Sequence, residues 1–139
     1  MTPVFFTDRD LGRRFPSILL DAGIRVERHE DHFRHNTPDE VWLAEVAARN
    51  WYVLTHDKRI GRNPLEIAAV MDHGCGLFVV IGKAPMPLLA RNVVATMPRI
   101  LAFIRRHEPP YIAKIHRPVH CPDEQLGSRP GKVVLWRKG

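Results

Sequence analysis

Short apolar runs alternate along this chain with longer amphipathic stretches. The runs are four or five residues long, rich in Val, Ile, Phe and Tyr, and end at polar or glycine residues, which is typical of buried strands. We expect four strands, at Val4–Thr7, Ile24–Glu27, Trp51–Thr55 and Leu77–Ile81, and a short fifth at Tyr111–Ile115. The polar stretch 29–36 has no regular period and is expected to be a loop.

The longer stretches carry apolar residues at helical spacing. They predict helices at Leu11–Ala22, from Thr37 to about Asn50, from Asn63 to His73 and at Met86–Arg106. The second begins with a capping box, in which Thr37 is the N-cap, Pro38 the first helical residue and Glu40 the box acid. Because strands and helices alternate, we expect an α/β fold with a parallel sheet of four to five strands and helices on both faces.

Length and composition narrow the class of protein. A chain of 139 residues with 45% hydrophobic residues is long enough for one core. The two cysteines, Cys75 and Cys121, form no CxxC pair, so a disulfide or a zinc site is not expected. We find no leader of the secretory type and no run near the ~18 apolar residues of a membrane span, so we expect a cytoplasmic protein without a membrane partner.

The net charge of +6 is placed unevenly. Residues 1–104 carry 13 Lys and Arg against 12 Asp and Glu, whereas residues 105–139 carry 8 against 3. We therefore divide the chain into a core domain, residues 1–116, and a basic C-terminal extension, residues 117–139. A basic excess of this kind favours an anionic partner such as nucleic acid, and the alternative is a solubilising tail.

Three aspartates stand where predicted elements begin or end. Asp8 follows the first strand, Asp39 opens a helix and Asp57 follows the third strand. In an open α/β sheet, the carboxyl ends of the strands border the ligand crevice, so these side chains are expected to converge. Asp8 and Asp57 have no obvious structural explanation, whereas an acid in a first helical turn, such as Asp39, is favoured by the helix dipole.

Neighbouring residues could complete such a site. Asp10 either caps the helix that follows or joins the acids, and Glu40 either serves its capping box or joins them. Arg9, Arg59 and Arg62 are candidate contacts for RNA phosphates, since guanidinium groups bind phosphate oxygens in a bidentate manner. Mg²⁺ and Mn²⁺ prefer oxygen ligands, and a cluster of three or four acids can hold one or two such ions for phosphodiester hydrolysis.

These motifs, in this order, resemble the PIN-domain ribonucleases, and more narrowly the PIN-like group that contains the VapC-type toxins of bacterial toxin–antitoxin pairs. The matching segments are Phe5–Gly12, Thr37–Trp42 and Trp51–Lys58, with a weaker match at Pro109–Ala113. The resemblance implies Mg²⁺- or Mn²⁺-dependent cleavage of RNA, with Asp8, Asp39 and Asp57 as catalytic residues and metal ligands. It also implies neutralisation by a cognate antitoxin protein, and a homodimer.

One position departs from the pattern of the family. Many PIN domains carry a further acid two places after the third-strand aspartate, and this chain has Arg59 there. Three alternatives follow: Asp10 or Glu40 completes the metal shell, the metal is held more weakly, or Arg59 binds phosphate.

Two other functions remain open. Asp8 and Asp10 after a first strand also resemble a phosphatase of the haloacid-dehalogenase type, and Asp57 with Lys83 resembles a response-regulator receiver. Neither explains Asp39. A non-catalytic nucleic-acid-binding module, using the basic extension, would need no metal and would bind with a steep salt dependence.

Overall fold

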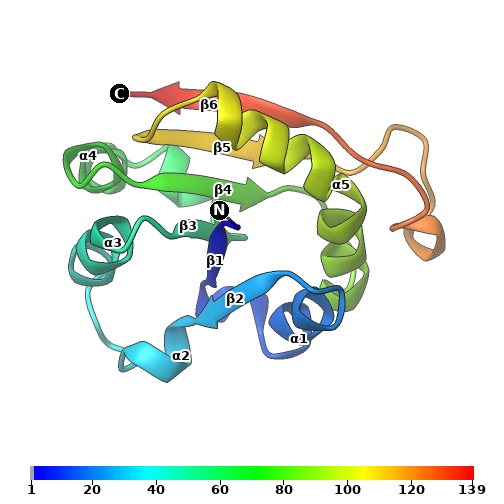
Figure 1. Ribbon diagram of the computed structural model, residues 1–139, viewed down its shortest axis with the longest axis horizontal. Coiled ribbons are helices and arrows are strands. Elements are labelled where there is room, and N and C mark those ends of the chain that lie inside the picture. Colours follow the sequence, from blue (N-terminus) through cyan, green and yellow to red (C-terminus); the bar gives the residue numbers. More distant parts are fainter. Residues whose placement is uncertain (1) are drawn as a thin grey trace.

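The computed structural model describes residues 2–139, and its centre is one six-stranded sheet of order β2-β1-β3-β4-β5-β6 (Figure 1). The first five strands are parallel and the sixth is antiparallel to β5. The strands are β1 Val4–Thr7, β2 Arg25–Arg28, β3 Tyr52–Thr55, β4 Gly76–Val80, β5 Tyr111–Ile115 and β6 Val133–Lys138. The predicted α/β class with a largely parallel sheet is confirmed, and β6 adds one strand to it.

Helices cover both faces of this sheet (Figure 1). One face is packed by α1 and α5, and the other by α3 and α4. The helical segments are η1 Arg9–Leu11, α1 Arg14–Asp21, α2 His29–His32, α3 Asp39–Ala48, η2 Lys58–Gly61, α4 Pro64–Asp72, α5 Met86–Arg106 and η3 Asp123–Gln125.

Residues next to each other in a strand enter different cores, since side chains alternate across a sheet. Phe5 and Leu54 pack with α1 and α5, whereas Phe6 and Val53 pack with α3 and α4. All four side chains are at most 1% exposed. Burial on both faces explains why the strands are continuous apolar runs rather than alternating ones.

The predicted order of strands and helices agrees with the structure, but several details differ. The helix expected from Leu11 begins at Arg14, with Leu11 in the turn η1, and β2 and β4 are each shifted by one residue. The stretch expected to be a loop at 29–36 begins with the short helix α2. Pro38 rather than Thr37 is the N-cap of α3 and makes no side-chain capping bond, so the predicted capping box is wrong. Part of the basic extension is ordered as β6 and pairs along β5, which the sequence did not predict.

Among the helices within residues 2–139, only α5 is long and apolar enough to cross a membrane, judged by length and composition alone. Its sequence is not an uninterrupted apolar run, because Arg91, Asn92 and Arg99 lie within it. In the structure, Leu89, Val93 and Ile100 of α5 are fully buried in the core against the sheet. This apolar face accounts for the helix as a core element.

The chain changes direction across the sheet between β1 and β3. It leaves β1 through α1 to reach β2 on one side, and returns through α3 to place β3 on the other side. A reversal of this kind is a topological switch point, where open α/β sheets bind ligands beyond the carboxyl ends of their strands. Asp8 and Asp57 follow the two strands at this point.

Candidate active site

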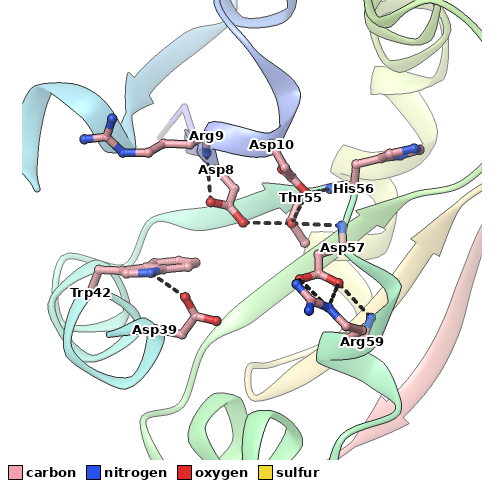
Figure 2. A network of polar contacts seen from close by, with 9 residues as sticks. All are labelled: Asp8, Arg9, Asp10, Asp39, Trp42, Thr55, His56, Asp57 and Arg59. Carbon is pink, nitrogen blue, oxygen red and sulfur yellow. Dashed lines mark hydrogen bonds and ion pairs between the residues drawn. The ribbon is translucent and has the colours of Figure 1, made fainter. Parts of the chain in front are cut away.

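The acidic residues gather beyond the carboxyl ends of β1 and β3 (Figure 2). Asp8 continues the ladder of β1, because its backbone N–H donates to the carbonyl of Leu54 at 3.0 Å. Asp8 is also the N-cap of η1, and its carboxylate accepts from the backbone N–H of Arg9 at 2.8 Å. The strand end and the tight turn together fix the position of this carboxylate.

Thr55 joins two of the aspartates. Its hydroxyl oxygen lies 3.0 Å from Asp8 Oδ2 and 3.2 Å from Asp10 Oδ2. The backbone N–H of His56 also donates to Asp10 Oδ2, at 3.0 Å. A hydroxyl carries one proton, so Thr55 can donate to only one of the two carboxylates at a time. The two carboxylates therefore share a single hydroxyl proton, and one of the two Thr55 contacts has no hydrogen donated to it.

The pKa values of Asp8 and Asp10 indicate a site that favours a proton or a cation. Burial, and then the charge of Asp10, raise the pKa of Asp8 to about 6. Partial burial also raises the pKa of Asp10, against hydrogen bonds from His56 and Thr55 that lower it. A raised pKa means that the folded protein disfavours both negative charges, and a bound cation would relieve that cost.

Asp57 has the opposite environment because Arg59 is its partner. Arg59 Nε and Nη2 donate to the two oxygens of Asp57 at 3.0 and 2.9 Å, and the Arg59 backbone N–H donates at 3.0 Å (Figure 2). These bonds hold the pKa of Asp57 below its usual value. The guanidinium is 82% exposed, so the pair lies at the surface and solvent weakens it.

Asp39 approaches the acids from the first turn of α3. One carboxylate oxygen accepts from the Trp42 indole N–H at 3.0 Å, and Asp39 contributes a small charge effect that raises the pKa of Asp8. Glu40, its neighbour, is directed elsewhere: its side chain is 77% exposed and lies 3.9 Å from His73, the C-cap of α4. Of the two candidates for a fourth acid, the structure places Asp10 among the aspartates and Glu40 beside His73.

The predicted phosphate contacts differ from one another. Arg9 is directed away from the acids (Figure 2), donating to His29 Nδ1 at 2.8 Å and to the Phe33 carbonyl at 2.6 Å. Arg9 therefore anchors α2, whereas Arg59 lies at the site on Asp57. Arg62 is exposed at the end of η2.

Glu66 is a site residue that the sequence did not reveal. It lies in the first turn of α4, and the sequence marked it only as part of a helix start. Partial burial, followed by the charges of Asp57 and Asp39, raises the pKa of Glu66. The only sequence signal for Glu66 was an acid soon after the Asp57 turn. Because acids are favoured in the first turn of a helix, that signal did not require a functional site.

A cleft of about 230 Å³ opens beside Asp8. Three cations border it, Arg9, Arg13 and Arg28, together with Glu30, which pairs with the latter two at 3.4 and 3.2 Å.

The acids do not form a complete cage for a metal ion. Among residues 2–139, no three His, Cys, Asp or Glu side chains lie close enough together to hold one. Asp57 is turned toward Arg59, and one oxygen of Asp39 toward Trp42. The donor chemistry nevertheless fits Mg²⁺ or Mn²⁺, because Asp8 and Asp10 share one hydroxyl, both have raised pKa values, and Mg²⁺ needs only one or two carboxylates besides water.

A family model described as "PIN like domain" matches residues 3–82, more than half of the chain. The chain belongs to this family. The match contains every acid of the site, including Glu66, and ends after β4. PIN-like domains are generally nucleases, so the fold is of the nuclease type and supports a hydrolase. Comparison with curated proteins gave no match, and comparison with solved structures gave none either.

Proposed function

We propose that this PIN-like domain is a Mg²⁺- or Mn²⁺-dependent endoribonuclease. The observation that carries the proposal is the Asp8–Asp10 pair, which shares the single hydroxyl of Thr55 at the topological switch point. Two carboxylates with raised pKa values and too few donors form a site that favours a cation. Asp39 supplies further negative charge from the neighbouring helix, and Asp57 would do so once its exposed pair with Arg59 opens.

Each residue has a role that follows from its contacts. Asp8 and Asp10 would hold the metal, Asp57 would join them once its pair with Arg59 opens, and Thr55 orients the carboxylates of Asp8 and Asp10. A bound Mg²⁺ or Mn²⁺ would supply hydroxide at neutral pH and offset the charge that develops on phosphodiester oxygens. Arg59 uses Nε and Nη2 on Asp57, which leaves Nη1 to contact a phosphate of the RNA.

The wider role that we propose is that of a VapC-type toxin. This rests on the resemblance of the motifs around Asp8, Asp39 and Asp57, and it brings a cognate antitoxin, a homodimer and a cytoplasmic location. Induced expression should arrest bacterial growth, and the Asp8→Asn variant should not. An RNA-processing enzyme without toxin activity would leave growth unchanged in both.

The test of the enzymatic proposal is cleavage of a fluorescent single-stranded RNA of mixed sequence with Mn²⁺. We expect the wild type to cut internally, and EDTA to stop it. Asp8→Asn and Asp57→Asn should each lose at least about 100-fold of the rate, as removal of a metal-site residue can cost. Glu45→Gln, an exposed acid on α3, is the matched control. Equal rates in all four proteins would refute the proposal.

A non-catalytic RNA-binding module is the second candidate, and one observation favours it. Asp57 is already neutralised by Arg59 without any metal. Such a module would bind RNA with affinity that falls steeply with salt, because binding to phosphates releases counterions. Its binding would not change on addition of EDTA, and Asp57→Asn would leave it intact.

A further inference from the structure

The last strand of the chain reaches the turn that carries Asp57. Residues 133–138 lie beyond the family match, which ends at residue 82, and form β6 at the edge of the sheet (Figure 1). The pairing of β6 with β5 contains a bulge: Ile112 pairs with Arg137 and Ala113 with Leu135. Trp136 is thus the extra residue, and bulges of this kind redirect a side chain.

Trp136 packs directly on Gly61, the last residue of η2. A Cβ atom added to Gly61 would lie 2.3, 2.5 and 2.6 Å from three atoms of the indole ring. The φ angle of Gly61 is outside the left-handed region, so the close ring and not the backbone conformation requires glycine here. Trp136 and Gly61 therefore occupy complementary space.

Two further contacts hold this arrangement. Arg137 Nε donates to the carbonyl of Gly61 at 3.2 Å. On β5, Lys114 Nζ lies 4.1 Å from the centre of the Trp136 ring, at the distance of a cation–π interaction. The end of η2 is thus fixed by both a side chain and a hydrogen bond from β6.

The turn η2 is short, so its two ends move together. It runs from Lys58 to Gly61, with Asp57 as its N-cap and Arg59 inside it. Ile60, next to Gly61, is 2% exposed and is packed in the same core cluster as Trp136. A displacement at Gly61 would therefore be passed to the Asp57 carboxylate and its Arg59 partner within one turn of chain.

We propose that β6 positions the acidic site, with Trp136 and Arg137 as positioning residues that act on Asp57 through Gly61. This inference rests on the proposed function for its metal, and it assigns to part of the basic extension a role in the site itself.

The experiment is a cycle of Trp136→Ala, Gly61→Ala and the double variant. Mn²⁺ affinity is measured by calorimetry on the free protein, and exchange of the backbone amides of residues 58–61 by mass spectrometry. We expect each single variant to weaken Mn²⁺ binding about 10-fold, as loss of a supporting residue does, and to speed exchange at η2. The double variant should recover most of the affinity, because the added methyl occupies space that the ring has left.

Controls separate positioning from general stability. Val134→Ala, an exposed site on the same strand, should change neither quantity, and Trp136→Phe should retain part of the affinity. All measurements are made well below each variant's melting temperature. The proposal would be overturned if the Trp136→Ala variant had the same Mn²⁺ affinity and the same amide exchange at η2 as the Val134→Ala variant.

Failure of the proposed function would give a different result. The wild type would then bind no Mn²⁺, but the amide exchange of η2 would still respond to Trp136→Ala and not to Val134→Ala. That outcome would support the positioning of Asp57 and Arg59 by β6 while rejecting the metal.

Discussion

The guanidinium of Arg59 contacts both carboxylate oxygens of Asp57, two residues before it in the chain. Many PIN domains carry an acid at the position of Arg59. In this chain the position holds a cation, which neutralises the negative charge of Asp57. The arginine is 82% exposed, which makes the pair easy to open. Opening it would free Asp57 for a metal ion and Arg59 for a phosphate group.

Replacing Arg59 should therefore strengthen metal binding. We expect Arg59→Gln to bind Mn²⁺ more tightly by a factor of up to about five, the range of an exposed ion pair. RNA should bind more weakly, because one phosphate contact is lost. Calorimetry with Mn²⁺ alone measures the first effect, and Arg62→Gln, exposed at the end of the same turn, is the control. Unchanged Mn²⁺ affinity would mean that Arg59 does not compete for Asp57.

Asp8 should make the metal-free protein less stable as the pH rises. Its pKa is raised from 3.8 to about 6 in the folded state, so the folded protein binds more protons than the unfolded chain between these values. The free energy of unfolding should thus fall by about 2 kcal/mol from this group as the pH rises from ~4.5 to ~7. Urea unfolding at pH 4.5 and pH 7 measures the difference.

The Asp8→Asn variant isolates this effect. It should be more stable than the wild type at pH 7, and the advantage should shrink toward pH ~3, below both pKa values, where Asp8 is protonated in both states. Asp21→Asn, an exposed site on α1, controls for the loss of one charge. A wild type and Asp8→Asn with parallel pH profiles would contradict the burial of charge at Asp8.

Asp10 and Glu40 should behave differently, although the sequence left them as equal alternatives. Asp10 shares the Thr55 hydroxyl with Asp8, whereas Glu40 lies beside His73. We expect Asp10→Asn to lower the RNA cleavage rate at least about 10-fold, and Glu40→Gln to change it less than about twofold. Initial rates at saturating Mn²⁺ decide this, and a reversed order would place the fourth ligand on α3.

Glu66 should matter for the metal although it was not predicted. Its side chain is half-buried, and the charges of Asp57 and Asp39 help to raise its pKa. We expect Glu66→Gln to weaken Mn²⁺ binding several-fold, within the range of a supporting ligand. Glu124→Gln, in the distant η3 turn, is the comparison. An Mn²⁺ affinity equal to that of this control would remove Glu66 from the site.

Much of the fold could be read from the chain because it depends on local patterns. The bounds of β1, β5 and α5 were predicted to the residue, since continuous apolar runs and helical spacing are local signals. The capping box at Thr37 failed because Thr37 lies one residue outside the helix cap. The strand β6 was missed because its stability comes from pairing with β5, not from its own pattern.

The sequence by itself determined the order of the elements and the placing of Asp8 and Asp57 at strand ends, since hydrophobic period and turn residues act over a few positions. Only the tertiary structure decided which groups meet. Thr55 contacts Asp8 across 47 residues of chain. Trp136 contacts Gly61 because β6 pairs with β5, and β5 in turn pairs with β4. Such contacts follow from strand order, register and side-chain rotamers, which are global properties of the packed sheet. For the same reason, only the folded chain shows that Asp8 and Asp10 share one proton donor while Asp57 has its own cation.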